Sequence, residues 1–322
     1  MMIGKNIVVT GGAGFIGSNL VRSLSGENEV TVIDDLSTGY IKNIEDLILN
    51  KDISFVNGSI TNLDLLQKTL KNVDYVFHEA AIPSVPRSIE DPVKSNNANV
   101  NGTLNVLVAA KDNNVEKVVY ASSSSVYGDT PTLPKREDMN PCPLSPYAVS
   151  KITGEYYCKV FKDVYGLSTT SLRYFNVYGQ RQDPSSEYAA VVPKFINLVL
   201  NDKSPIIYGN GLQTRDFTYI KDVVDANILA AGSNVTGNFN IAGGKCISIN
   251  DLSKIIIGIC GKDLDSVYRD SRPGDIMHSL ADVSKAKEEF GYKPNYNLTK
   301  GLEKAIEWYS LQKQDYLASR EI

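Results

Sequence analysis

Short runs of β-branched residues alternate with longer helical stretches through the first half of this sequence, and this alternation limits the possible folds more than any other feature. Five runs have the length of strands, and they read KNIVVTG, EVTVID, DISFVNG, VDYVFHEA and KVVYASS. Parallel strands joined by crossover helices have this order, and they are apolar throughout because helices cover both faces of the sheet. We therefore expect an α/β fold with a doubly wound parallel sheet.

The composition excludes several functional classes. The formal net charge is -4, and lysine and arginine are spread along the chain, so no basic surface for nucleic acid or an anionic membrane is expected. No apolar run approaches about 18 residues, and the amino terminus leads straight into a strand, which predicts a cytoplasmic protein without a membrane segment. The four cysteines form no CxxC pair and the two histidines lie far apart, which predicts free thiols and no metal site.

A glycine-rich turn, TGGAGFIGSNL, follows the first predicted strand and opens an apolar-periodic helix. Its glycines fit both GxGxxG and a GxxGxxG spacing, which let the backbone turn tightly and approach a pyrophosphate at a helix N-terminus. This context predicts a Rossmann-type dinucleotide site. The cofactor-binding residues expected in the turn are Gly11, Gly14, Phe15, Ile16 and Gly17.

An acidic residue stands where the second predicted strand ends. Asp34 lies 20 residues after Gly14 in the glycine turn. A carboxylate at this place accepts hydrogen bonds from a ribose diol and repels a 2'-phosphate. The sequence therefore predicts NAD, rather than NADP, as the cofactor.

A tyrosine and a lysine share one face of a later helix, which begins in SPYAVSKITGEYY. Ser145 is the expected N-cap and Pro146 the first helical residue, so Tyr147 and Lys151, four residues apart, lie one above the other. The strand KVVYASS ends nearby in the serines Ser122–Ser125. Because ligands bind beyond the carboxyl ends of the strands of a doubly wound sheet, these serines and the glycine turn are expected on the same rim.

The glycine motif, the serine-rich strand end and YAVSK together resemble the extended short-chain dehydrogenase/reductase superfamily over nearly the whole chain. Within it, SPYAVSK, LRYFNVYGQRQDP, YAAVVPKF and TRDFTYIKDVVDAN resemble the nucleotide-sugar 4-epimerases, most closely those that accept UDP-N-acetylglucosamine. The resemblance implies that Tyr147 is the catalytic base and Lys151 its partner and the anchor of the nicotinamide ribose. It also implies that Ser123 aligns the substrate and that Ser124 assists.

Tyrosine needs help to act as a base. Its ordinary pKa is about 10, and lowering it by about 3 units requires roughly 4 kcal/mol of preference for the phenolate. A cation about 4 Å away supplies about that much at an effective dielectric near 20, so Lys151 and the positive nicotinamide ring are expected to provide the shift. The phenolate then takes the proton of the sugar 4-hydroxyl. The resemblance implies a transient 4-keto sugar, and hence interconversion of UDP-GlcNAc and UDP-GalNAc, with UDP-Glc and UDP-Gal as further candidate substrates.

Further cofactor residues are implied only by the resemblance. They lie around the adenosine, along the pyrophosphate and beside the nicotinamide, and they are Asp35, Ser37, Thr38, Gly39, Ser59, Ile60, Ala80, Ala81, Asn99 and Tyr174. Relatives commonly have an aspartate at the position of Ser59, which weakens the expected contact with adenine.

The resemblance also implies a set of residues that bind the UDP-sugar. Those for the diphosphate, the uridine and the sugar are Asn176, Arg215, Arg272, Tyr208, Asp275, Val191, Ser84 and Arg87. Guanidinium groups suit phosphate oxygens, and an acidic protein needs such local cations. Ser279 falls where a tyrosine in relatives excludes N-acetyl groups, and a serine leaves room at carbon 2 of the sugar.

Single residues distinguish this chain from other enzymes of the superfamily. Sugar 4,6-dehydratases carry Asp-Glu where this chain has Ser124 and Ser125, and the decarboxylases keep a glutamate at the second of these positions. UDP-glucuronate 4-epimerase shares the serine-rich strand end and stays as the alternative. A non-catalytic NAD-binding regulator is disfavoured, because it would lack the tyrosine, the lysine or the serine.

The expected organisation has two lobes. Residues 1–175, with 214–242 returning to them, form the NAD-binding Rossmann domain, and residues 176–213 and 243–322 form a smaller mixed α/β substrate lobe. The helices in NGTLNVLVAAKDNN and YAVSKITGEYYCKVFKDVYG carry apolar residues on more than one side, which favours a homodimer built on them.

Overall fold

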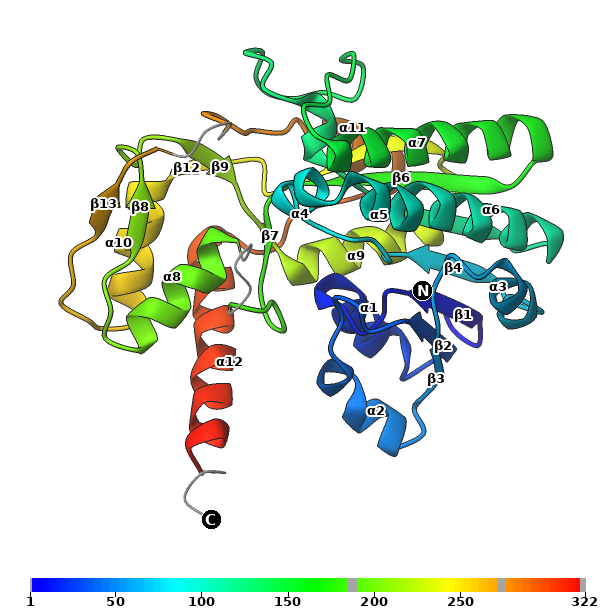
Figure 1. Cartoon of the computed structure of the whole chain (residues 1–322), viewed down its shortest axis with the longest axis horizontal. Helices are drawn as coiled ribbons and strands as arrows, with labels where there is room; N and C mark the ends of the chain where they lie inside the picture. The colour runs from blue at the N-terminus through cyan, green and yellow to red at the C-terminus, as the bar shows by residue number, and fades with distance from the viewer. Residues whose placement is uncertain (1, 185–189, 272–275, 319–322) are drawn as a thin grey trace.

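The computed structural model describes residues 2–184, 190–271 and 276–318, and it has a large lobe built on one sheet and a smaller lobe beside it (Figure 1). Seven strands form the sheet, in the order β11-β6-β5-β4-β1-β2-β3, and every neighbouring pair is parallel. The doubly wound parallel sheet expected from the sequence is thus confirmed. The strands are β1 (Asn6–Thr10), β2 (Glu29–Asp34), β3 (Ile53–Asn57), β4 (Tyr75–His78), β5 (Lys117–Ser123), β6 (Ser168–Tyr174) and β11 (Gly237–Ile241).

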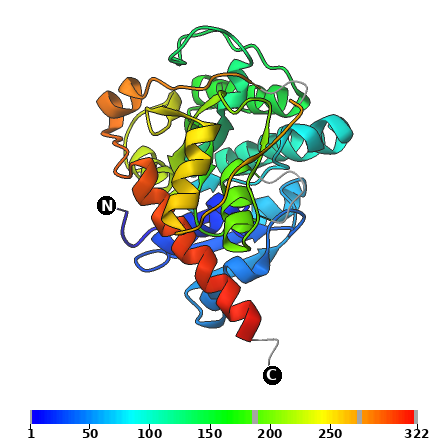
Figure 2. The ribbon, with the colours of Figure 1, turned by 90° about the vertical axis from the view of Figure 1, so that its left-hand side faces the viewer.

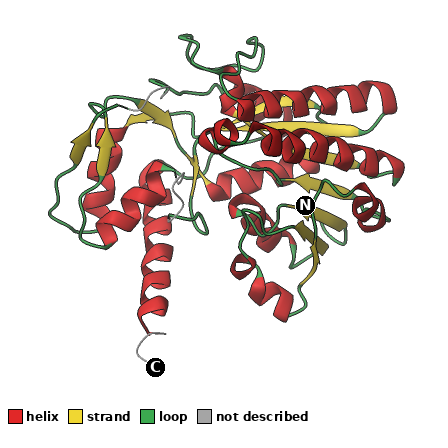
Figure 3. Cartoon of the chain, in the orientation of Figure 1, coloured by secondary structure: helices red, strands yellow, loops and turns green. Residues whose placement is uncertain are grey.

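Helices cover both faces of this sheet (Figure 3). One face is covered by α1 (Phe15–Leu24), α2 (Glu45–Leu49), α9 (Ile220–Ala231) and α11 (Ser284–Phe290). The other is covered by α3 (Leu63–Thr69), α6 (Gly102–Asp112) and α7 (Pro146–Tyr165). Shorter elements complete this half, namely η1 (Ile41–Asn43), α4 (Val85–Glu90), α5 (Pro92–Asn96), η2 (Asn97–Asn101) and η3 (Ser124–Tyr127).

The central strands are apolar because both of their faces are buried. In β1, Ile7 and Val9 belong to the core under α1 and α9, whereas Val8, between them, belongs to the core under α3 and α6. All three side chains are at most 1% exposed. A strand with one face in water would alternate apolar with polar residues, so the continuous run in the sequence reflects this double burial.

The smaller lobe packs three helices against short two-stranded ladders, and the side view shows these helices facing the viewer (Figure 2). Its helices are α8 (Val191–Leu200), α10 (Ile249–Ile259) and α12 (Leu298–Ala318). Its ladders pair β8 (Ile206–Tyr208) with β13 (Val267–Arg269) and β9 (Thr214–Asp216) with β12 (Cys246–Ser248). A third ladder, β7 (Val177–Tyr178) with β10 (Thr218–Tyr219), lies where the chain passes between the lobes.

The chain returns from the smaller lobe to the sheet. Within residues 214–242, α9 packs beside α1 and β11 pairs with β6, while β9 pairs with β12 in the smaller lobe. Lys117, the first residue of β5, binds the end of α9 and the segment that follows it. Its Nζ donates to the carbonyls of Ala230, Ser233 and Val235 at 2.7 to 2.8 Å. These contacts hold the end of α9 against the sheet.

Two further observations concern membrane-spanning helices and the cysteines. Among the described residues, no helix is both long and apolar enough to cross a membrane. All four cysteines are free, with Cys158 buried and Cys142 and Cys246 exposed. The free thiols expected from the sequence are therefore confirmed.

Candidate active site

A cavity of about 420 Å³ opens at the carboxyl ends of the strands, where the strand order changes direction between β1 and β4. We call it the glycine-turn cavity, because Gly11, Gly14 and Gly17 form part of its wall. Ligands of doubly wound sheets bind at such a switch point. One half of a dinucleotide then lies over β2 and β3, and the other half over β4, β5 and β6.

The glycine turn fits a pyrophosphate. A side chain at Gly17 would bring its Cβ within 2.1 Å of the Gly11 carbonyl oxygen, so only glycine allows this close packing of helix against turn. Gly14 is the N-cap of α1, no side chain caps the helix there, and its first turn holds no acidic residue. The first backbone N–H groups and the positive end of the helix dipole thus face the cavity, as an anionic group requires.

The acid at the end of β2 holds the turn in place. Asp34 is buried, and its two carboxylate oxygens accept hydrogen bonds from the backbone N–H groups of Ala13 and Leu36, at 2.9 and 2.8 Å. Burial raises its pKa despite these bonds. Its neighbour Asp35 is exposed; burial opposes its ionisation, but hydrogen bonds from Ser37 and Ser59 outweigh it and hold its pKa below the usual value. Both acids line the glycine-turn cavity on the side of β2 and β3.

Most residues expected to bind the cofactor line this one cavity. They are Gly11, Gly14, Phe15, Ile16, Gly17, Asp34, Asp35, Ser37, Thr38, Ser59, Ile60, Ala80, Ala81, Tyr147, Lys151 and Tyr174. Gly39 lies behind the wall, where a Cβ would stand 2.9 Å from Oδ2 of Asp34. Asn99 is also outside the lining.

Asn99 acts through its neighbours. Its side chain accepts a hydrogen bond from the backbone N–H of Ile82 at 2.7 Å, and donates to the carbonyl of Ile82 and the hydroxyl of Ser150, both at 3.1 Å. Ile82 lines the cavity, and Ser150 stands next to Lys151 on α7. Asn99 therefore joins the loop after β4 to the helix that carries the tyrosine and the lysine.

Helix α7 begins as the sequence predicts. Ser145 is its N-cap and accepts a hydrogen bond from the backbone N–H of Ala148 at 3.1 Å, and Pro146 is its first residue. Tyr147 is half-buried and Lys151 is buried, and both line the glycine-turn cavity. The Lys151 ammonium lies 5.8 Å from the centre of the Tyr147 ring and donates to the carbonyl of Ala121 at 2.7 Å.

Burial acts on the ionisation of both Tyr147 and Lys151. Burial raises the pKa of Tyr147 above its usual value; the Ser123 hydroxyl lowers it, and the negative charge of Glu79 raises it further. Burial also lowers the pKa of Lys151 to about 8, against the charge of Glu79. Desolvation thus favours the neutral form of both groups, and the phenolate expected from the sequence requires further positive charge near the phenol.

The serines at the end of β5 have different places. Ser122 is buried and lines the cavity, whereas Ser123 and Ser124 are half-buried and do not. The Ser123 hydroxyl accepts a hydrogen bond from the backbone N–H of Ser125 at 3.2 Å and thereby caps η3. Its hydroxyl also lowers the pKa of Tyr147, so it is oriented by the turn and interacts with the tyrosine.

A buried ion pair holds α7 against the sheet. Glu155, one further turn along from Lys151, binds the Arg173 guanidinium of β6 through Nε at 2.8 Å and Nη2 at 2.6 Å. Both side chains are at most 2% exposed. Ser122 donates to the same carboxylate at 2.5 Å, and Arg173 donates to the hydroxyl of Tyr127 at 2.8 Å. Tyr147, Lys151 and Glu155 thus form one stripe whose buried end is bound to β5 and β6.

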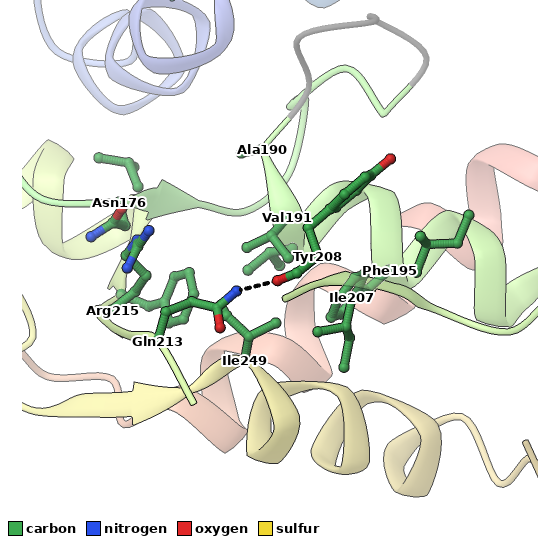
Figure 4. Close-up of a pocket in the computed structure, with 13 residues that line it drawn as sticks. Asn176, Ala190, Val191, Phe195, Ile207, Tyr208, Gln213, Arg215 and Ile249 are labelled. Carbon is green, nitrogen blue, oxygen red and sulfur yellow. Dashed lines mark hydrogen bonds between the residues drawn. The ribbon is translucent and has the colours of Figure 1, made fainter. Parts of the chain in front are cut away.

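A second cavity, of about 290 Å³, lies in the smaller lobe and is called here the Arg215 cavity. Asn176, Val191, Tyr208 and Arg215, four residues expected to bind the nucleotide, line it. The side chains of Asn176 and Arg215 lie close together at one end (Figure 4). Ala190, the N-cap of α8, lines both cavities, so the two are neighbours.

The other residues expected to bind the substrate are dispersed. Ser84 and Arg87 line the glycine-turn cavity, and Ser84 has a φ of 89°, a strained conformation for a residue with a side chain. Ser279 is half-buried and lines neither cavity; its backbone N–H donates to the carbonyl of Thr214, next to Arg215, at 3.1 Å. Arg272 and Asp275 lie outside the described residues.

Several lining residues were missed by the sequence analysis. In the Arg215 cavity the amide of Gln213 donates to the carbonyl of Tyr208 at 2.8 Å, beside Ile249 (Figure 4), and Phe217 also lines this cavity. In the glycine-turn cavity, Tyr40 and Glu79 were missed. Glu79 had a detectable signal, since it is an acidic residue directly after an apolar predicted strand.

Comparison with known proteins agrees with this geometry. Residues 7–242 match the family model described as NAD dependent epimerase/dehydratase family. A relative from Methanocaldococcus jannaschii, named putative UDP-glucose 4-epimerase, is 42% identical over 305 residues, which are 94% of this chain and 97% of the relative.

Two solved structures are also similar. The UDP-N-acetylglucosamine 4-epimerase from Methanobrevibacter ruminantium, in complex with UDP-N-acetylmuramic acid, is 46% identical, with a TM-score of 0.94, over 97% of this chain and 100% of that one. The UDP-glucuronic acid 4-epimerase from Bacillus cereus, with UDP-glucuronic acid and NAD, is 36% identical, with a TM-score of 0.88, over 95% of this chain and 99% of that one.

The buried ion pair makes a prediction about stability. Glu155→Gln leaves the Arg173 guanidinium buried without a counter-charge, and we expect the free energy of unfolding to fall by about 3 to 5 kcal/mol. Denaturant titration measures this. Replacing both partners with methionine removes both charges and should recover most of the loss. The control is Asp163→Asn, which breaks an exposed pair with Lys159 on the same helix; a loss in the control as large as in Glu155→Gln would contradict the assignment.

Proposed function

Because this chain belongs to the NAD dependent epimerase/dehydratase family, we propose that it interconverts UDP-GlcNAc and UDP-GalNAc by inverting carbon 4 of the sugar. The chain is a nucleotide-sugar 4-epimerase with NAD as its cofactor; the proposal concerns the sugar and the residues that act on it. The single observation that carries the assignment of roles is that Tyr147 and Lys151 share one cavity with the glycine turn.

The roles follow from the positions. The glycine turn and the start of α1 hold the pyrophosphate, Asp34 and Asp35 face the adenosine side, and Lys151 faces the nicotinamide side. NAD, when bound, supplies the acceptor and donor of a hydride at carbon 4. Tyr147 exchanges the proton of the 4-hydroxyl, and the Ser123 hydroxyl orients that group through its interaction with Tyr147.

The base must lose a proton first. Burial holds Tyr147 in its protonated form in this structure. A positive charge near the phenol favours the phenolate, and at an effective dielectric near 20 two charges about 4 Å apart interact by roughly 4 kcal/mol, enough to shift a pKa by about 3 units. Lys151, whose ammonium donates to the Ala121 carbonyl, is the protein group that we expect to provide part of this interaction energy.

The UDP part of the substrate is proposed to occupy the Arg215 cavity. Arg215 and Asn176 come from different segments and lie together there, which suits phosphate oxygens, and Tyr208 lies along the same cavity. Since Ala190 lines both cavities, a UDP-sugar bound here has its sugar directed toward Tyr147.

The choice of an N-acetylated sugar rests on two supports. One is the 46% identity to a UDP-N-acetylglucosamine 4-epimerase. The other is Ser279, a small residue next to the strand that carries Arg215. UDP-glucuronate 4-epimerase is the second candidate, because a structure of such an enzyme is 36% identical over nearly the whole chain. An assay with UDP-GlcNAc, UDP-glucose and UDP-glucuronate, without added NAD, separates the two candidates.

Removing the phenol tests the proposed base. Tyr147→Phe keeps the ring but cannot exchange the proton, so turnover should fall by about 10² to 10⁴-fold, the range that general acid-base catalysis contributes. Bound NAD, released by denaturation and quantified, should persist. Tyr165→Phe, at the exposed end of the same helix, is the control. Turnover of Tyr147→Phe near that of the wild type would remove Tyr147 from the mechanism.

Enlarging residue 279 tests the sugar preference. If Ser279 leaves the space at carbon 2, Ser279→Tyr should lower kcat/KM for UDP-GlcNAc by at least about tenfold, the effect of roughly 1.4 kcal/mol of lost binding, while UDP-glucose turnover changes little. Ser279→Ala, which keeps the space, should retain both activities. An equal loss for the two sugars in Ser279→Tyr would defeat this assignment.

We also propose a homodimer in which α7 packs across a two-fold axis. Val149, Tyr156, Val160 and Val164 form one exposed apolar stripe along α7, and they are between 47% and 66% exposed. On α5, which packs beside α7, Val93 is 78% exposed. A stripe of this kind, repeated by symmetry, forms a self-complementary interface.

Sedimentation velocity measures the proposed assembly. The wild-type chain should sediment as a dimer, and Val160→Asp should sediment as a monomer because it buries a charge at the interface. Val267→Asp, on the exposed β13 of the smaller lobe, should remain dimeric. A monomeric wild-type chain would refute the dimer and leave the proposed catalysis unaffected.

A further inference from the structure

A glutamate stands at the carboxyl end of the central strand β4. The backbone N–H of Glu79 donates to the carbonyl of Thr10 at 3.1 Å, which places it beside the glycine turn at the switch point of the sheet. It lines the glycine-turn cavity together with Tyr147, Lys151 and Tyr174. None of the roles assigned above uses this carboxyl group.

One oxygen of this carboxylate is held and the other is not. Oε1 accepts a hydrogen bond from the hydroxyl of Tyr174 at 2.9 Å, and that hydroxyl accepts one from the side-chain amide of Asn227 at 2.8 Å. Oε2 is buried and has no hydrogen-bond partner within the part of the chain that the structure describes. Buried polar atoms are nearly always paired, so an unpaired carboxylate oxygen in a ligand cavity calls for a functional reason.

The titratable groups around Glu79 come from three elements. Tyr147 and Lys151 belong to α7, Tyr174 to β6 and His78 to β4, while α9 contributes the uncharged Asn227. Burial raises the pKa of Glu79 to about 7, against the Tyr174 hydrogen bond and the charge of Lys151. Burial lowers the pKa of His78 to about 3, so this histidine stays neutral in the physiological range.

The position of Glu79 relates it to one half of the cofactor. Asp34 and Asp35 lie on the adenosine side of the switch point, over β2 and β3, and Glu79 lies on the opposite side with Lys151 and Tyr147. That side receives the nicotinamide end, on the roles assigned to Tyr147 and Lys151 in the proposed function. The nicotinamide ring carries a positive charge only in the oxidised cofactor, so an ionised carboxylate near it distinguishes the two redox states.

We propose that Glu79 is a positioning residue for the nicotinamide end, which fixes Tyr174 through Oε1 and, through its carboxylate charge, favours bound NAD⁺ over bound NADH. A 4-epimerase has to begin each turnover with its cofactor oxidised. A fixed negative charge on this side of the cavity lowers the fraction of enzyme in which the cofactor stays reduced. This role does not depend on which sugar the enzyme accepts.

The ratio of bound cofactors tests the proposal without a sugar. Purified protein is equilibrated with an excess of NAD⁺ and NADH in equal amounts, freed of unbound cofactor, and the bound nucleotides are released and quantified. Glu79→Gln keeps an acceptor for Tyr174 but removes the charge, and it should shift the bound ratio toward NADH by at least about tenfold at pH of about 8. Tyr174→Phe keeps the carboxylate but loses the hydrogen bond that lowers its pKa, so its ratio should shift toward NADH by less than that of Glu79→Gln.

The pH dependence of the bound-cofactor ratio provides a second measurement. The carboxyl group has its pKa near 7, so lowering the pH from about 8 to about 6 protonates it, and the preference of the wild-type protein for NAD⁺ should fall. The ratio in Glu79→Gln should change less than that of the wild type over this range, because Lys151, with a pKa of about 8, titrates in both proteins. An unshifted ratio in Glu79→Gln, a wild-type ratio independent of pH, or an equal shift in Tyr174→Phe would each overturn the proposal. Loss of epimerase activity alone would not overturn it, so the outcome for Glu79 is independent of the outcome for the proposed function.

Discussion

The ion pair between Glu155 and Arg173 is the contact on which the geometry of the active site depends. It joins α7 to β6, and through Ser122 it also joins α7 to β5, the strand that ends at Ser123. Both side chains are almost completely buried, so each charge requires the other. Since Tyr147, Lys151 and Glu155 follow one another at four-residue spacing, a helix that is fixed at Glu155 cannot rotate without moving the tyrosine and the lysine.

Desolvation is the force that the rest of the site has to oppose. It raises the pKa of Tyr147, lowers that of Lys151 and raises that of Glu79. All three groups are therefore pushed toward their neutral forms, and small changes of nearby charge decide which of them ionises. A positive charge near Tyr147 favours its phenolate, so proton transfer at this residue depends on nearby charge.

Local signals in the sequence predicted the framework well. Apolar runs located β1 to β5, the glycine spacing located the turn, and Ser145 with Pro146 located the start of α7. Tertiary contacts were harder to predict. Strand β6 has the polar sequence STTSLRY and contains the buried Arg173, so no apolar run marks it, and β11 follows a long excursion of the chain into the smaller lobe. The Glu155 and Arg173 partners are 18 residues apart, and nothing in their local patterns predicts that they meet.

The two cavities offer different groups to an anionic ligand. The glycine turn uses backbone N–H groups and a helix dipole, which add no net charge and accept only a group that approaches the backbone closely. The Arg215 cavity offers a guanidinium beside an amide, groups that suit phosphate oxygens. In the proposed function, the glycine turn holds the cofactor through rigid backbone groups, and the Arg215 cavity holds the substrate through side chains, which can move as a substrate enters and leaves.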